Sequence, residues 1–184
     1  MSTRATYQFK PEDKWSPTIT LYIHHDGYQE GAAAYAHEVA KYAGPTKGGI
    51  VERWIRALPG DAEITRDHNA HGDTEYRYTF TNRGTQVKVQ GCIYRKDEKS
   101  WTTLYEGPTA EWINDQLKLE GADRCVILHG EVETVQKVLE KMQEEIKLAK
   151  HYEGGNRSWA ISQLHQHAKG IPEAEALVKE SLLT

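Results

Sequence analysis

The stretch that decides the fold runs from Leu21 to Gly31 and reads Leu21-Tyr22-Ile23-His24-His25-Asp26-Gly27-Tyr28-Gln29-Glu30-Gly31. Residues 18–24 alternate apolar and polar side chains, which predicts a half-buried strand. Residues 30–43 instead place apolar side chains at helical spacing. The strand therefore passes into a helix at the Asp26-Gly27 pair, which is typical of a turn, and we expect Gly27 to supply a positive φ there.

The same reasoning predicts further elements on both sides of this turn. Residues 3–10 form a strand, and the loop from Pro11 to Pro17 joins it to residues 18–24. A second, short amphipathic helix is expected over residues 49–58 and ends at Pro59-Gly60. Alternating runs separated by turn residues then predict an antiparallel meander over residues 74–81, 86–95 and 101–106.

Beyond Pro108 the strand signals nearly vanish, except at Cys125–Leu128. Apolar residues between Val132 and Ala149 recur at alternating spacings of three and four, which predicts one helix with a narrow apolar seam. The seam faces either the core of the same chain or a second copy, which would make the protein a homo-oligomer. Helices are also expected from Thr109 and over residues 157–168 and 172–182.

Together these elements predict an α+β fold. We expect an antiparallel sheet of about five strands with two inserted helices, followed by a mainly helical C-terminal half. A chain of 184 residues fits one compact domain. It divides into a sheet region over residues 1–107 and a helical region over residues 108–184, which we expect to pack on the same core.

Composition narrows the classes of partner. The net charge is -4 and no long basic block occurs, which disfavours nucleic-acid binding. The apolar runs are too short for a membrane span, and the N-terminus lacks the apolar core of a secretory signal, so a cytoplasmic location is expected. Five Trp and ten Tyr form an amphipathic aromatic set that suits binding interfaces.

The turn after residues 18–24 holds the first candidate binding site, made of His24, Asp26, Gly27 and Tyr28. Imidazole can change charge near neutral pH, and a carboxylate can orient it. Adjacent strand residues point to opposite faces, so His24 and His25 are not expected to act together unless the strand ends before them. The competing interpretation is structural, with Asp26 and Gly27 forming the turn and Tyr28 packing.

A second cluster, between Asp67 and Asp73, is the candidate metal site. His68, His71 and Asp73 could bind a divalent ion, although no HExxH or other defined metal spacing is present and an ordinary polar loop explains the composition as well. The loop from Gly44 to Gly49 could offer amides to an anion. No P-loop, GxGxxG, GxSxG or CxxC motif occurs, so no cofactor is expected.

The residues also resemble a known family. The opening Thr3-Arg4-Ala5-Thr6 and the segment from Tyr22 to Gln29 resemble small uncharacterised proteins of phages and prophages, which carry a Thr-Arg-Ser-Thr-like run and a Tyr-Cys-His-Trp-Asp-Gly-Tyr-Pro-like segment. Ile23 replaces the cysteine of that segment, His25 its tryptophan and Gln29 its proline. The resemblance covers residues 3–95 and implies an accessory role in a mobile element, in the cytoplasm of the host cell.

Three functions follow as hypotheses. The first is a phage or prophage accessory protein that acts as a non-enzymatic binding module, either as a counter-defence inhibitor of a host protein or as a sequesterer of a small signalling molecule. The alternative is a metal-dependent phosphoester hydrolase that uses the histidine clusters. The second alternative is a self-associating structural protein. The missing catalytic motifs favour binding over catalysis.

Overall fold

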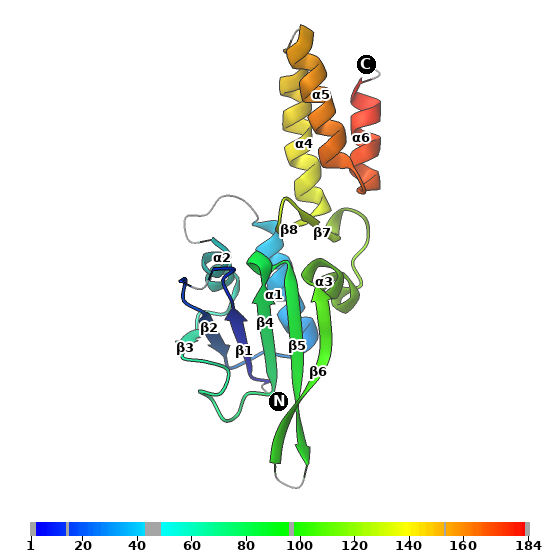
Figure 1. The fold of residues 1–184 in the computed structure, drawn as a ribbon. Helices are drawn as coiled ribbons and strands as arrows, with labels where there is room; N and C mark the ends of the chain where they lie inside the picture. The colour runs from blue at the N-terminus through cyan, green and yellow to red at the C-terminus, as the bar shows by residue number, and fades with distance from the viewer. Residues whose placement is uncertain (1–2, 14, 43–48, 96–97, 153, 183–184) are drawn as a thin grey trace.

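The computed structural model describes residues 3–13, 15–42, 49–95, 98–152 and 154–182. Their fold is a mixed α/β structure, in which a mainly antiparallel six-stranded sheet continues at one end into a helical arm (Figure 1). The strand order is β3-β2-β1-β4-β5-β6, and only β1 and β4 pair in parallel within this described sheet. The strands are β1 (Ala5–Phe9), β2 (Ile19–Ile23), β3 (Glu63–Thr65), β4 (Tyr76–Thr81), β5 (Gln86–Arg95) and β6 (Glu98–Pro108).

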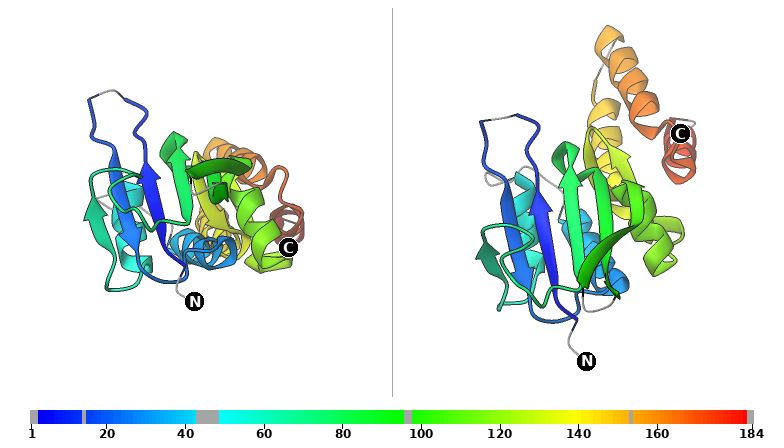
Figure 2. Two further views of the ribbon diagram at one scale, coloured as in Figure 1. Left: turned by 90° about the horizontal axis from the view of Figure 1, so that it is seen from below. Right: turned by 60° about the horizontal axis from the view of Figure 1, so that its bottom comes forward.

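Helices cover one face of this sheet, as the two views of Figure 2 show. That layer contains α1 (Gln29–Lys41), α2 (Gly49–Ala57) and α3 (Thr109–Leu117). The short helical turns η1 (Asn82–Gly84) and η2 (Gly121–Asp123) connect neighbouring elements. A hairpin of β7 (Cys125–Leu128) and β8 (Glu131–Thr134) leads into the arm, which consists of α4 (Val135–Lys150), α5 (Gly154–Ala168) and α6 (Pro172–Leu182).

Aromatic side chains build the core between the sheet and its helices. Tyr7 of β1 stacks on Tyr78 of β4 at 5.0 Å between ring centroids, and Phe9 stacks on Phe80 at 5.3 Å. Trp54 of α2 packs on this pair of strands, with its ring 5.0 Å from that of Tyr7. The period-two alternation of both strands directs these rings to the same face, where burial of their large apolar area stabilises the layer.

Most of the predicted elements are confirmed, including the two N-terminal strands, the two inserted helices and the meander. The sheet has six strands, because the three-residue β3 pairs with β2 at one edge. β8 was not expected either, and Val132 lies in this strand instead of in the helix. The helix α4 begins at Val135, where the Thr134 side chain caps it by accepting a hydrogen bond from the Lys137 amide at 3.3 Å.

The buried side chains form two hydrophobic clusters. One joins the sheet to α1, α2 and α3, and the other joins α4, α5 and α6. The seam of α4 is filled by α5 and α6 of the same chain, through Val135, Val138, Met142, Ile146 and Ala149. Within the region 108–184, Ala110, Trp112, Ile113 and Cys125 belong to the cluster of the sheet, and the buried residues of α4, α5 and α6 belong to the other.

Two further observations concern the cysteines and the membrane. Cys92 and Cys125 are both free thiols, and burial raises the pKa of the Cys125 thiol to about 12. Among the described helices, none combines the length and the apolar character needed to cross a membrane.

The turn between β2 and α1 differs from the expectation in one respect. The positive φ belongs to Asp26, at 55°, and not to Gly27. Gly27 is required because its backbone touches β1: a Cβ atom there would lie 2.6 Å from the Ala5 Cβ and 2.8 Å from the Ala5 nitrogen. The Gly27 amide donates to the Thr3 carbonyl at 2.9 Å, and its carbonyl accepts from the Tyr78 hydroxyl at 2.9 Å.

Replacing Gly27 by Ala is expected to lower the free energy of unfolding by about 2–3 kcal/mol, because the added methyl group forces β1 to move. Gly72→Ala is the matched control, since no atom lies within 4 Å of the added Cβ, and its effect should stay below about 0.5 kcal/mol. Urea unfolding measures both variants. Equal stability of the two would contradict this role of Gly27.

Candidate functional site

The first candidate site, the turn after β2, brings its two histidines to the same acidic segment. The strand ends at Ile23, so the alternation of strand side chains no longer applies to His24 and His25. The His24 Nε2 lies 2.9 Å from the Glu63 carboxylate, and the His25 Nε2 lies 3.8 Å from the Asp61 carboxylate. Both imidazoles therefore pair with residues in or just before β3.

The other members of this candidate site have separate surroundings. Gly27 is buried against β1, whereas Asp26 and Tyr28 are exposed. Tyr28 precedes α1 and makes no side-chain cap to it. Burial raises the pKa of the Tyr35 hydroxyl, and the negative charge of Asp26 raises it further. The exposed side chains of this turn are therefore polar or, in Tyr28, amphipathic.

The second candidate site, the loop from Asp67 to Asp73, lies across the outer face of the sheet. The His68 imidazole bridges two strands, with Nδ1 2.7 Å from the Thr6 hydroxyl and Nε2 3.0 Å from the Thr79 hydroxyl. Burial lowers the pKa of His68 to about 4, and the nearby positive charges of Arg77 and Lys10 add to this effect. A neutral imidazole donates through one nitrogen and accepts through the other, which suits two hydroxyl partners.

His71 and Asp73 also have partners within the chain. The His71 ring stacks on Tyr22 at 3.7 Å between centroids, and the Tyr22 hydroxyl donates to Asp73 at 3.0 Å. Asp73 also lies 3.2 Å from the Arg4 guanidinium. Burial and the Asp73 hydrogen bond raise the pKa of Tyr22 to about 12. Among the described residues, no group of three or more His, Cys, Asp or Glu side chains is placed to hold a metal ion.

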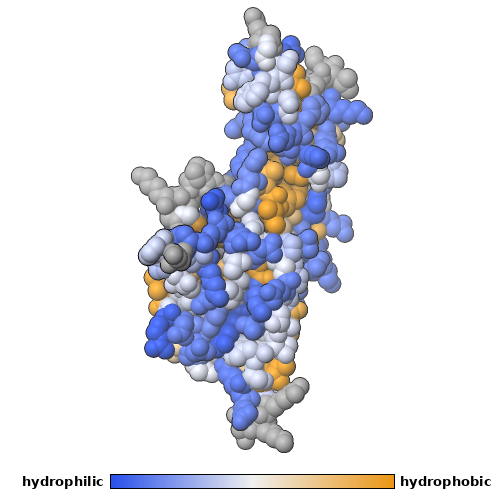
Figure 3. Space-filling view, in the orientation of Figure 1, coloured by the Kyte–Doolittle hydropathy of each residue, from blue (hydrophilic) through white to orange (hydrophobic). Residues whose placement is uncertain are grey.

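Cationic side chains of β4 and β6 also contact this loop or residues next to it. The Arg77 guanidinium stacks over the Trp101 ring at 3.7 Å and donates to the His68 carbonyl at 3.1 Å. Lys99 donates to the Gly72 carbonyl at 2.8 Å. Figure 3 shows that this face of the sheet is largely hydrophilic. The histidine loop is therefore explained by its packing on the sheet.

A cavity of about 480 Å³ lies at the opposite face, where β1 and β4 end near α2, α3 and β8. Phe9, Trp54, Phe80 and Ile113 supply an apolar lining. Charged residues from several elements also line it: Lys10, Glu12, Asp13, Arg53, Arg83 and Glu131. None of the residues in the two candidate sites, the turn after β2 and the loop from Asp67 to Asp73, belongs to this lining. Gly49, the last residue of the loop proposed to offer amides to an anion, does line the cavity.

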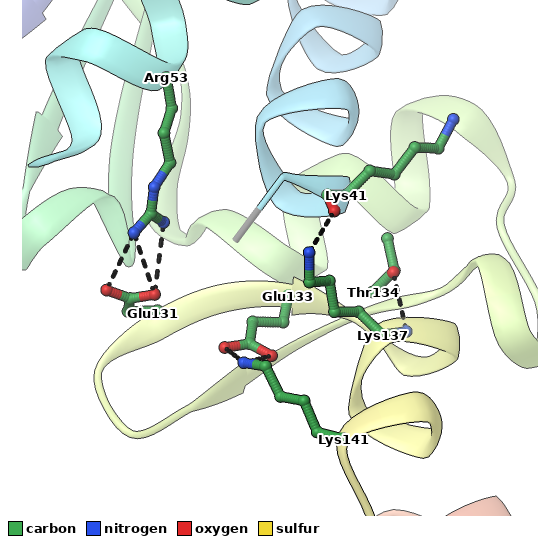
Figure 4. Close-up of polar contacts among 7 residues, drawn as sticks. All are labelled: Lys41, Arg53, Glu131, Glu133, Thr134, Lys137 and Lys141. Atoms are coloured by element: carbon green, nitrogen blue, oxygen red, sulfur yellow. Dashed lines mark hydrogen bonds and ion pairs between the residues drawn. The ribbon is translucent and has the colours of Figure 1, made fainter. Parts of the chain in front are cut away.

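Arg53 and Glu131 form the central polar contact of the cavity (Figure 4). The Arg53 Nη2 lies 3.2 Å from Glu131 Oε1, and its Nη1 lies 3.3 Å from Oε2. The Arg53 side chain is 8% exposed, whereas that of Glu131 is 39% exposed. A buried cation with a half-exposed counter-ion is thus built into the cavity wall.

Thr109 and the η1 turn complete the lining. Thr109 is buried, and within the described residues its Oγ1 has no hydrogen-bond partner. At the rim, Asn82, Arg83 and Gly84 adopt successive positive φ angles of 49°, 54° and 86°. A side chain at Gly84 would overlap the Cδ1 of Ile50, so this turn fits closely against α2.

Sequence reasoning missed the cavity, although one signal for it exists. Arg53 follows Ile50 by three positions in an amphipathic helix, so a cation lies on the apolar face of α2. Such a residue is rarely buried without a partner. The loop proposed to offer amides to an anion falls largely on residues 43–48, which lie outside the described residues.

Comparisons with family models, with curated proteins and with solved structures give no match to this chain. The resemblance of residues 3–95 to small phage proteins therefore stays a prediction.

The low pKa of His68 makes the stability depend on pH. As the pH falls from about 6.5 to about 4, the unfolded chain binds a proton that the folded His68 does not, and we expect about 2 kcal/mol of stability to be lost over this range. His68→Gln should reduce this slope, as measured by urea unfolding at several pH values. His165→Gln, which removes an exposed imidazole from α5, is the control. An unchanged slope in His68→Gln would refute the assignment.

Proposed function

We propose that this chain is a non-enzymatic binding module that holds a small molecule in the cavity beside Arg53. The observation that carries the proposal is the cavity itself, about 480 Å³ in volume, with aromatic walls and a buried guanidinium. Ligand pockets are typically concave, about 300–1,000 Å³ in volume, and mostly apolar with a few polar groups that orient the ligand.

The distribution of charges supports binding over acid–base catalysis. The two arginines of the cavity form ion pairs, Arg53 with Glu131 and Arg83 with Glu12. The histidine with a strongly lowered pKa, His68, lies on the other face of the sheet and is held between two hydroxyls. Groups with strongly shifted pKa values mark catalytic sites when they line a cleft, and His68 does not line this cavity.

The cavity also favours one version of the phage hypothesis. A protein that sequesters a small signalling molecule needs an internal site of this size, whereas an inhibitor of a host protein needs a large complementary surface. The resemblance of the N-terminal half to phage proteins is the support for a role in counter-defence. The hydrolase alternative has less support, because His68, His71 and Asp73 are engaged in packing the loop on the sheet.

The proposal predicts that blocking the cavity abolishes ligand binding. Ser16 lines the cavity from the exposed loop between β1 and β2, so Ser16→Trp is expected to fill part of it. Thr18→Trp adds the same ring to the same loop at an exposed position that does not line the cavity. A metabolite library screened by thermal unfolding is the measurement. Ligands at about 100 times their Kd should raise the Tm by about 5 °C or more.

Stabilisation of the unmodified protein and of Thr18→Trp, but not of Ser16→Trp, is the expected result. Ligands that stabilise all three proteins equally would show that they bind elsewhere. A library that contains nucleotides, organic acids and neutral metabolites and stabilises none of the three would count against a small-molecule binding role.

A further inference from the structure

We propose that the ligand of the cavity is an organic anion, with an apolar or aromatic body and a carboxylate or phosphate group that takes the place of Glu131 on the Arg53 guanidinium. The inference rests on the proposed function and names the chemical class that the same site accepts. Three features of the cavity point to it: the unequal exposure of the ion pair, the buried hydroxyl of Thr109, and the aromatic lining.

The two members of the ion pair differ in exposure, so that Glu131 can move into solvent and Arg53 cannot. The Arg53 side chain is 8% exposed, and α2 holds it over the cavity. Removing the counter-ion of a buried charge is costly, so Arg53 requires an anion at this place. The Glu131 side chain is 39% exposed, so its rotation would bring the carboxylate into water. An incoming anion therefore restores the charge balance while Glu131 turns to solvent.

The backbone beneath Glu131 permits this exchange. Glu131 follows His129 and Gly130, whose φ angles of 51° and 77° form the tight turn of the β7–β8 hairpin. It pairs with Leu128 across the hairpin. This two-residue turn with positive φ at both positions matches the twist of the strands and keeps the backbone in place. Only the side chain of Glu131 has to move.

Thr109 supplies a second contact for an anion. It lines the cavity as the first residue of α3, and its buried Oγ1 has no protein partner among the described residues. Leaving a buried hydroxyl unsatisfied costs free energy, and an oxygen of the ligand would satisfy it. The preceding Pro108 offers no side-chain cap to α3. The positive end of this helix dipole therefore also favours a negative group here.

The guanidinium and the aromatic residues define the shape of the ligand. A planar fork of N–H donors fits both carboxylate and phosphate, which share the geometry of paired oxygens. Phe9, Trp54 and Phe80 lie with ring centroids 4.9–5.5 Å apart and form an apolar wall for the body of the ligand. The ligand therefore combines a flat apolar part with one anionic group.

The test uses four probes in two matched pairs. Indole-3-acetate and indole-3-acetamide share one body and differ in the carboxylate, and adenosine 5′-monophosphate and adenosine differ in the phosphate. Isothermal titration calorimetry with the full chain measures their affinities. At least one anion should bind about tenfold tighter than its neutral counterpart, because a charge-assisted bidentate contact is lost in the neutral probe. The pair that shows the preference identifies carboxylate or phosphate as the group recognised.

Four variants separate recognition from structure. Arg53→Gln should remove the preference for the anion, and Thr109→Val, which keeps the shape of the side chain, should weaken anion binding about fivefold to tenfold. Glu131→Gln should strengthen it several-fold, because the competing carboxylate is gone. Arg56→Gln removes the same charge from the same helix, but from an exposed side chain that does not line the cavity, and should change the affinity less than threefold.

Two results would overturn the inference. The first is equal binding of the anionic and neutral probes, and the second is failure of all four probes to bind at millimolar concentration. In either case, ligands from the thermal screen that Ser16→Trp blocks would still support a small-molecule binding role. If Arg53→Gln is unfolded by circular dichroism, the opposite effects of Thr109→Val and Glu131→Gln decide the question. Weaker or unchanged anion binding in Glu131→Gln would then contradict the exchange.

Discussion

The close approach of Gly27 to the start of β1 is the constraint on which the rest of the structure depends. Its two backbone hydrogen bonds, to the Thr3 carbonyl and from the Tyr78 hydroxyl, join the end of β2 to β1 and β4. The next residues begin α1, whose buried face consists largely of alanines: Ala32, Ala33, Ala36 and Ala40. These small side chains let the helix lie close to the sheet, and its position in turn defines one wall of the cavity.

The two faces of the sheet are covered differently, one by apolar packing of helices and the other by a polar loop. On the inner face, aromatic rings and helices bury apolar area. On the outer face, a polar loop packs on the strands, where its His68 contacts the buried Thr6 and its His71 stacks on Tyr22. The polar side chains of this loop pair with residues outside it: His68 with Thr6 and Thr79, and Asp73 with Tyr22 and Arg4. A cluster of histidines and carboxylates can therefore result from the need to pair buried hydroxyls, with no ligand involved.

Local patterns in the sequence predicted the elements better than their arrangement. The alternation in residues 3–10 and 18–24 and the spacing in residues 30–43 correspond to β1, β2 and α1. The parallel pairing of β1 with β4 could not be predicted in this way, because residues far apart in the chain set its register. Val132 fits both a helical spacing and a strand, and it lies in β8, while α4 begins after the Thr134 cap.

The site was harder to predict than the fold, for a related reason. Its lining comes from loops, helices and strands that are distant in sequence, and no segment carries a motif for it. The sequence suggested that a glycine is needed at position 27 for a positive φ, whereas the structure shows that any side chain there would overlap Ala5. A single sequence does not distinguish these two reasons for a glycine. Arg53 on the apolar face of α2 was the one local irregularity that pointed to the cavity.

The hairpin turn at Gly130 lies where the arm joins the rest of the chain. The strand that begins with Glu131 runs directly into α4, and Lys137 of that helix also donates to the Lys41 carbonyl at the end of α1 at 3.0 Å (Figure 4). The helix α4 has 16 residues and is therefore about 24 Å long, so a tilt of about 5° at its base would displace its far end by about 2 Å. The base of the three-helix cluster therefore lies next to Glu131 and Val132 in the cavity wall, so that the attachment of the arm and the shape of the cavity share the same short strand.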